Sequence, residues 1–106
     1  MEKYVRTYDL EGIKTAFPTV KYLRMTRTAR QCIVKLRLSL EDVITIIHAL
    51  TPQNFYKSMT TYADHQIWQD VYHAEYHGVM LYVKFMIDSQ GYLIVSFKEK
   101  GEGDLR

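Results

Sequence analysis

Strict alternation of apolar and polar side chains late in the sequence restricts this chain to folds that contain an antiparallel hairpin. Residues 79–88 place an apolar side chain at every odd position, and residues 92–98 form a second alternating run. A period of two is typical of a strand with one face on a core. Gly91 lies between the runs and can supply the left-handed residue of a three-residue loop, Ser89 to Gly91, closed by a bulge. Two antiparallel strands joined by a short loop are therefore predicted.

The loop length decides which side chains of the two strands lie opposite each other. A three-residue loop makes the apolar sets coincide, and the expected core pairs are Phe85 with Val95 and Val83 with Phe97. On the outer face the same register pairs Tyr82 with Lys98, and Lys84 with Ser96. Directly paired residues have Cβ atoms about 4.5 to 5.5 Å apart. A phenol and an ammonium group are therefore expected side by side.

A further strand is expected before this hairpin, joined to it by a two-residue turn at His77-Gly78. This turn places His73 opposite Tyr82 and puts Gln69 on the same face. Asp70 then points toward the core, where a carboxylate needs a hydrogen-bonding partner. A bulge near His73 is the alternative arrangement. Four polar side chains are expected together on the outer surface: Gln69, His73, Tyr82 and Lys98.

The N-terminal half is expected to be helical after an edge strand at residues 3–8. Asp9 can cap a short helix that ends at Phe17-Pro18, and Thr26 can cap a second helix. A third begins with a capping box of Ser39 and Asp42 and stops at Thr51-Pro52. The apolar stripes of the last two helices are Ala29, Cys32, Ile33 and Leu36, and Val43, Ile46, Ile47 and Leu50. Helices followed by strands predict an α+β fold, an antiparallel sheet with two or three helices packed on one face.

Length and composition predict one domain over residues 1–100, followed by a disordered tail at residues 101–106. A chain of 106 residues with 47% hydrophobic content can bury one core and does not read as disordered. The single cysteine, Cys32, excludes an internal disulfide, and the four histidines lack metal-ligand spacing, so no metal or other cofactor is expected. Without a signal segment or membrane-spanning run, a cytoplasmic protein is expected.

Basic residues are concentrated in one part of the sequence. The net charge is only +2, but six basic residues and no acid lie between Lys21 and Arg37. Such a block can attract RNA or an acidic protein, or it can be an ordinary solvated helix face. The sequence leaves these readings open.

Three segments carry a family resemblance: residues 55–65 (FYKSMTTYADH), 67–72 (IWQDVY) and 93–100 (LIVSFKEK). They closely resemble the MqsR (motility quorum-sensing regulator) toxin family. The resemblance implies a RelE-like fold and the toxin of a type II toxin-antitoxin pair, an endoribonuclease that cleaves messenger RNA without ribosomes at GCU-like sequences. It also implies an MqsA-like antitoxin, with a zinc-binding and a DNA-binding part, that inhibits the toxin. Contact with DNA is expected through the antitoxin alone.

The resemblance also implies site residues. Lys57, Gln69, Tyr82 and Lys98 are expected to be catalytic, and the last three are the residues that the strand register had already placed on one face. The expected substrate contacts are Tyr56, Met59, His73 and Lys84. The loop after Tyr72 lacks the arginines expected in the family, and we interpret His73 as a substitute for a lost cation.

The chemistry of RNA cleavage suits such a set. RNA carries its own nucleophile, the 2′-hydroxyl, so catalysis needs proton removal, in-line positioning, charge stabilisation at the phosphate and a proton for the leaving 5′-oxygen, without a metal. We expect Lys57 and Lys98 to stabilise the phosphate, Tyr82 to orient groups or carry a proton, and Gln69 to hold the RNA. The general base stays open: a lysine or tyrosine needs a lowered pKa, whereas His73 suits neutral pH.

Two other functions fit the same residues. In a non-catalytic RNA-binding module, tyrosines stack on bases and lysines hold phosphates without cleavage. Alternatively, the chain is an interaction protein that only titrates a transcriptional repressor. Under both hypotheses the outer-face lysines and tyrosines are not catalytic groups.

Overall fold

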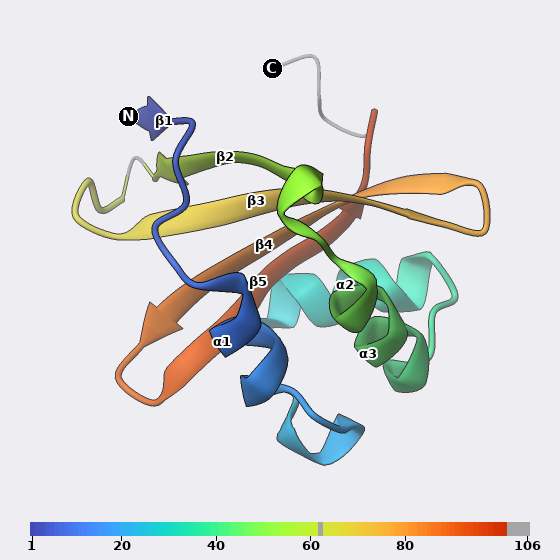
Figure 1. The fold of residues 1–106 in the computed structure, drawn as a ribbon. Coiled ribbons are helices and arrows are strands. Elements are labelled where there is room, and N and C mark those ends of the chain that lie inside the picture. The colour runs from blue at the N-terminus through green and yellow to red at the C-terminus, as the bar shows by residue number, and fades with distance from the viewer. Residues whose placement is uncertain (62, 102–106) are drawn as a thin grey trace.

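A computed structural model describes residues 1–61 and 63–101 of the chain as one sheet covered by helices on one face (Figure 1). The helices are α1 (Leu10–Ala16), α2 (Arg27–Lys35) and α3 (Leu40–Ala49), with short 3-10 turns at Val20–Tyr22 and Pro52–Asn54. The strands are β1 (Glu2–Lys3), β2 (Phe55–Thr60), β3 (Trp68–Tyr76), β4 (Val79–Asp88) and β5 (Gly91–Glu99). They form one antiparallel sheet in the order β1-β2-β3-β4-β5. The predicted α+β fold is confirmed.

Each helix begins at its predicted cap. The Asp9 carboxylate accepts the Gly12 N–H at the start of α1, and the Thr26 hydroxyl accepts the Ala29 N–H at the start of α2. Ser39 and Asp42 form the reciprocal capping box of α3. These bonds satisfy backbone N–H groups that have no partner within the helix.

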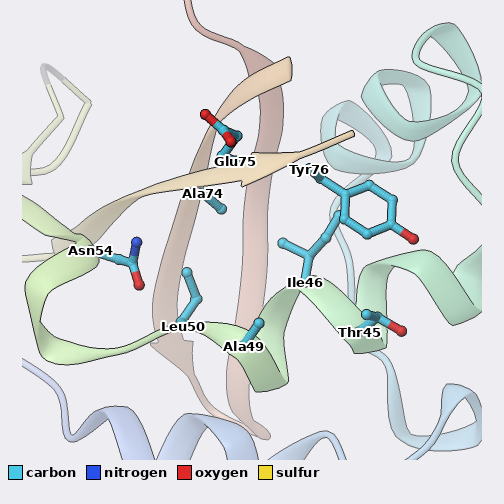
Figure 2. Close-up of a pocket in the computed structure, with 8 residues that line it drawn as sticks. All are labelled: Thr45, Ile46, Ala49, Leu50, Asn54, Ala74, Glu75 and Tyr76. Carbon is cyan, nitrogen blue, oxygen red and sulfur yellow. The ribbon is translucent and has the colours of Figure 1, made fainter. Parts of the chain in front are cut away.

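The core lies between the helices and the facing side of the sheet. The predicted stripes are inside: α2 buries Ala29 and Ile33, and α3 buries Val43, Ile46 and Ile47. Figure 2 shows where α3 meets β3 around a small cavity of about 90 Å³. In this view Ala74 points toward α3, whereas Glu75 points to the other side of the strand. The sheet therefore has a core face and an outer face, the outer face being the one turned away from the helices.

Asp70 has the partners that its buried position requires. Its side chain is fully buried, and it accepts hydrogen bonds from the backbone N–H groups of Thr7 (3.1 Å to each oxygen) and Tyr8 (2.9 Å). The Tyr8 hydroxyl donates to the Trp68 carbonyl at 2.7 Å. A stretch of the N-terminal segment is thereby fixed against β3, and no bulge near His73 is needed.

These bonds also explain why the predicted N-terminal strand is wrong in extent. Strand β1 covers only Glu2 and Lys3, which pair with Met59 and Ser58 of β2, and the chain has left the sheet by Thr7. The N–H groups of Thr7 and Tyr8 bond to the Asp70 carboxylate, so they are not available to a strand partner.

The predicted loop between β4 and β5 is one residue too long. Asp88 pairs with Gly91, so the loop is Ser89-Gln90, and the missing residue reappears as a bulge at Val95. Phe85 therefore opposes Ile94 rather than Val95, and Ile94 is the fully buried side chain. Beyond the bulge the prediction is confirmed, since three pairs follow the expected register: Val83 with Phe97, Tyr82 with Lys98, and Lys84 with Ser96. Between β3 and β4, His73 pairs with Tyr82 as predicted.

One further expectation is wrong, and another falls mostly outside the described residues. Ile87, expected on the core face, is 43% exposed near the end of β4. Of the predicted tail only Gly101, in a turn, belongs to the described residues, and residues 102–106 lie outside them. Within the described part of the chain, no helix has the length and apolar character that crossing a membrane requires.

Candidate active site

The outer face of the sheet carries all the predicted site residues. One row across the strands runs from Lys57 through Val71 and Lys84 to Ser96, and the next joins His73, Tyr82 and Lys98. Met59 pairs with Gln69 beside the first row. Directly paired residues of antiparallel strands point to the same face, as do residues two apart along one strand. The two ammonium groups, the phenol and the carboxamide therefore share a face that the helices leave uncovered (Figure 1).

A β-bulge at the start of β2 brings Tyr56 to this face. Phe55 pairs with Tyr72 and Lys57 pairs with Val71, so Tyr56 is the extra residue of the bulge. Phe55 packs against the core, whereas Tyr56 is 39% exposed and lies against the His73 ring, with 4.4 Å between centroids. Two consecutive side chains, Tyr56 and Lys57, thus point to the outer face. Bulges redirect side chains in this way.

Three aromatic rings form a compact cluster there. The centroids of His73 and Tyr82 lie 4.6 Å apart with the planes 19° from parallel. Those of Tyr56 and Tyr82 lie 6.0 Å apart with the planes at 12°. The His73 ring thus lies closer to each tyrosine ring than the two tyrosine rings lie to each other. The ammonium of Lys57 lies 5.1 Å from the centre of the Tyr56 ring. The rings offer a stacking surface for a base, with a cation at its rim.

Lys57 forms an ion pair with a residue that the sequence did not single out. Its ammonium lies 2.6 Å from a carboxylate oxygen of Glu2 on β1. Partial burial lowers the pKa of Lys57, but the hydrogen bond and the negative charge of Glu2 outweigh this effect, and the pKa is raised overall. Lys57 is therefore held as a cation, suited to a negative phosphate rather than to proton removal.

A hollow of about 390 Å³ lies beside this ion pair, at the edge of the sheet formed by β1 and β2. We call it the edge hollow, and its lining is Met1, Glu2, Met59, Thr60, Thr61, His65, Gln69 and Lys84. Three of these, Met59, Gln69 and Lys84, are predicted site residues. The outer face thus combines an aromatic cluster with an adjoining cavity, and Glu2 and Lys57 connect the two.

Comparison with known proteins shows the family of this chain. The family described as "Motility quorum-sensing regulator, toxin of MqsA" matches residues 6–99. Similarity also extends to the mRNA interferase toxin MqsR of Escherichia coli (strain K12), which is 44% identical over 78 residues, or 74% of this chain and 79% of that protein. The chain belongs to the MqsR toxin family. The matched range contains all eight predicted site residues, whereas Glu2 lies before it.

In this MqsR-family toxin, sequence reasoning predicted three of the eight residues that line the edge hollow and missed five, Glu2 and His65 among them. Glu2 is far from Lys57 in the sequence, and no local pattern indicates that β1 pairs with β2. His65 lies between β2 and β3, in a segment without alternation. The family resemblance included His65 in a matching segment, which is the one signal that could have drawn attention to it.

The basic block of the toxin does not belong to this site. Arg24 forms two hydrogen bonds with Asp88, at 2.6 and 2.9 Å, and also donates to the carbonyls of Gly91 and Tyr92, so it fastens the end of the β4–β5 hairpin. Arg27 and Arg30 are exposed on α2, which packs against the core face of β5. The block is therefore divided between a structural ion pair and a solvent-facing helix.

Titratable groups that could hold a metal ion do not gather at the site. Within residues 1–61 and 63–101, the structure has no group of three or more histidine, cysteine, aspartate or glutamate side chains with suitable geometry. The polar groups of the site are ammonium, phenol, carboxamide, imidazole and a single carboxylate. This donor set suits binding and proton transfer at a phosphodiester more than metal coordination.

Proposed function

We propose that this toxin is an endoribonuclease that cleaves messenger RNA, independently of ribosomes and of metal ions, at GCU-like sequences. The relative from E. coli is named an mRNA interferase. The observation that carries the proposal for this chain is the shared outer face of Lys57, Gln69, Tyr82 and Lys98 beside the aromatic cluster. RNA passing over this face would meet cations for its phosphate and rings for its bases.

The reaction is a transesterification within the RNA. The 2′-oxygen attacks the neighbouring phosphorus, the 5′-oxygen leaves, and the products are a 2′,3′-cyclic phosphate and a 5′-hydroxyl. Negative charge accumulates on the non-bridging oxygens, and preorganised cations at that place stabilise the transition state. Lys57 and Lys98 supply these cations, Tyr82 supplies a proton to the leaving oxygen, and Gln69 holds the RNA backbone or a base.

The substrate contacts divide between the two parts of the face. Tyr56 and His73 belong to the aromatic cluster and offer stacking to a base next to the scissile bond. Met59 and Lys84 line the edge hollow, where an apolar side chain and a cation can hold a second nucleotide. We infer that the aromatic cluster and the edge hollow bind successive nucleotides of one strand.

The family description names an antitoxin, MqsA, and the second partner proposed here is a cognate antitoxin of this kind. It would have a zinc-binding part that contacts the toxin and a DNA-binding part that represses the operon. The toxin would act in the cytoplasm, where its messenger RNA substrate is. Growth arrest on expression alone and its relief by the co-expressed antitoxin would support this pairing.

A cleavage assay with defined RNA tests the activity. The purified chain is incubated with an oligonucleotide containing one GCU, in the presence of EDTA, and the ends are identified by mass spectrometry. We expect cleavage, a 2′,3′-cyclic phosphate, and no reaction when the attacking 2′-hydroxyl is replaced by hydrogen. Lys57→Ala should lower kcat by about 100 to 1,000-fold, the usual cost of removing a preorganised charge donor.

Two controls separate cleavage from binding alone. Arg30→Gln changes an exposed charge on α2, across the sheet from the site, and should leave the rate as it is in the parent. Tyr82→Phe should bind RNA but cleave it slowly. If the RNA stays intact at protein excess and these variants behave like the parent, the chain is an RNA-binding module and the proposal fails.

A further inference from the structure

We propose that Glu2 is the general base of the cleavage reaction, the group that removes the proton from the attacking 2′-hydroxyl. This inference rests on the proposed function and completes it, since the residues at Lys57, Gln69, Tyr82 and Lys98 supply no base. Glu2 lies before the range that the family comparison matches, and its position in this chain points to the role.

The position of Glu2 is defined by two contacts. Strand β1 pairs with β2, with Glu2 opposite Met59, which holds the residue at the edge of the outer face. Its carboxylate then reaches Lys57 at 2.6 Å, yet 46% of the side chain is exposed. Glu2 is thus fixed next to a phosphate-binding cation and remains open to solvent and substrate.

The surroundings of Glu2 suit a scissile phosphodiester. Glu2 lines the edge hollow, and it is the one acidic residue among the described lining residues. The other charged and titratable groups that line this hollow are Lys84 on β4, His65 in the β2–β3 connection and the amino group of Met1. Lys57 on β2 lies next to the hollow, where it pairs with Glu2. A phosphate that enters is attracted by the ammonium groups of Lys57 and Lys84. The 2′-hydroxyl next to that phosphate then lies beside the Glu2 carboxylate.

Other candidates for the base are less suited. Lys57 is held protonated by Glu2, as described above. His73 has its Nε2 atom buried and its ring packed against Tyr56 and Tyr82, so this nitrogen is not presented to a ribose. Asp70 is fully buried on the core side with both oxygens accepting backbone hydrogen bonds. Glu2 combines a free lone pair, exposure and a place in the hollow.

A Glu2 oxygen takes the proton of the 2′-hydroxyl while the 2′-oxygen forms a bond to phosphorus, and the bond from phosphorus to the 5′-oxygen breaks with its electron pair. The 5′-oxygen takes a proton from the Tyr82 hydroxyl. Lys57 has three N–H donors, so it can hold a non-bridging phosphate oxygen as well as Glu2. Afterwards Glu2 is protonated and Tyr82 is a phenolate, and exchange with water restores both.

The test compares the parent with Glu2→Gln, which removes the basic oxygen but keeps the size and hydrogen-bonding capacity of the side chain. General base catalysis contributes typically 100 to 10,000-fold, so kcat/KM should fall by at least about 100-fold. The parent rate should also decline at acidic pH, in the range where carboxyl groups titrate, and Glu2→Gln should lack this decline. Glu2→Asp keeps a carboxylate and should retain both the decline and an intermediate rate.

A substrate with sulfur in place of the 5′-oxygen distinguishes the base from the acid. The thiolate leaves without a proton, so it should restore much of the rate lost in Tyr82→Phe but none of that lost in Glu2→Gln. The matched control is Glu11→Gln, because Glu11 also pairs with a lysine, Lys14 at 3.8 Å, and is 77% exposed on α1. This control should behave like the parent, and the thermal midpoint of each variant checks its folding.

The outcomes are distinct. A parent that cleaves RNA together with a Glu2→Gln variant within threefold of it, or with the same acidic decline, overturns the assignment of Glu2 and leaves the proposed function standing. A rate loss in Glu2→Gln that the thio substrate restores also overturns it, since Glu2 would then act on the leaving group. A parent that leaves RNA intact overturns the proposed function and the role of Glu2 together.

Discussion

Asp70 is a single residue on which the N-terminal segment depends. It is the kind of group that is costly to bury, and it is tolerated because three backbone hydrogen bonds surround it. Those bonds hold Thr7 and Tyr8 under β3, a few residues from Glu2 on β1. A carboxylate on the core face therefore helps to position a carboxylate on the outer face.

Replacing Asp70 tests this connection. Asp70→Asn keeps the shape of the side chain but removes the charge that strengthens these bonds, and it turns an amino group toward N–H donors. We expect a loss of about 1 to 3 kcal/mol in the free energy of unfolding, measured by urea denaturation. Glu11→Gln, on the surface of α1, is the control, and an unchanged midpoint in Asp70→Asn would contradict the role described.

Because of the ion pair between Arg24 and Asp88, the free energy of unfolding should depend on pH in the acidic range. Hydrogen bonds from Arg24 and from the Gln90 N–H lower the pKa of Asp88 to about 2, below the ordinary value of 3.8. A carboxyl group whose pKa is lower in the folded state stabilises the fold above its ordinary pKa, and this contribution is lost as the pH falls toward 2.

Asp88→Asn should therefore be less stable than the parent at neutral pH, and the difference between the two should shrink between about pH 4 and pH 2. Urea midpoints measured across this range provide the check. A difference that stays constant down to pH 2 would show that Asp88 contributes through its shape and not its charge.

At the level of elements, the β3–β4 hairpin sets the register on which the site depends. His77 and Gly78 form its turn with φ angles of +49° and +80°, a left-handed conformation that glycine adopts without strain. Because Tyr76 pairs with Val79 around this turn, His73 comes to lie opposite Tyr82. The aromatic cluster follows from that register.

Gly78→Ala is expected to cost about 1 to 2 kcal/mol in stability, because an L-residue is strained in this conformation. A Cβ at Gly78 would meet no other atom within 4 Å, so steric contact does not contribute to the loss. Thermal unfolding measures it. His77→Gly, at the other left-handed position, should change stability in the opposite direction, and equal losses in both variants would contradict this account of the turn.

The predicted elements were right where the signals are local. Caps, apolar stripes and the His77-Gly78 turn depend on residues a few positions apart, and the structure has them as predicted. The β4–β5 loop was predicted one residue too long because alternation gives the total offset between two strands but not where an extra residue lies. The loop is one residue shorter than predicted, and the bulge at Val95 adds one residue to β5, so the offset between the strands is unchanged. Tyr82 therefore still pairs with Lys98.

Long-range contacts explain the parts of the site that could not be predicted. The pairing of Glu2 with Lys57 joins residues 55 positions apart, and no motif specifies which edge β1 would join. Similarly, the sequence indicated that Asp70 needed a partner but not that Thr7 and Tyr8 would provide it. The predicted site residues share one face because the strand register was predicted correctly, and their roles stay predictions. The edge built by the N-terminal segment was not predicted.

At the level of the whole molecule, stability and activity are assigned to different faces of one sheet. The helices cover one face and bury the core, while the predicted site occupies the other (Figure 1). The exposed charges of α2 are separated from the site by the thickness of a packed layer, about 10 Å, and charges farther apart than about 8 Å are largely screened at physiological salt.

The double variant Arg27→Gln/Arg30→Gln should therefore cleave RNA with a kcat/KM within about twofold of the parent at physiological salt. Lys84→Gln should instead weaken RNA binding and reduce the slope of log K against log salt by about 0.7, the value for one lost phosphate contact on a single strand. Binding curves at several salt concentrations test both. A larger effect from the helix charges would mean that RNA also contacts α2.

The attachment of residues 24–26 to β5 has a consequence for the order of synthesis. The Thr26 N–H bonds to the Ile94 carbonyl and the Ile94 N–H to the Arg24 carbonyl, so the start of α2 awaits a strand that is translated about seventy residues later. Lys98 lies on that same strand. A half-made chain on the ribosome therefore lacks both a complete core and Lys98. Under the proposed function, such a chain has no complete site with which to cleave the message that is still being translated.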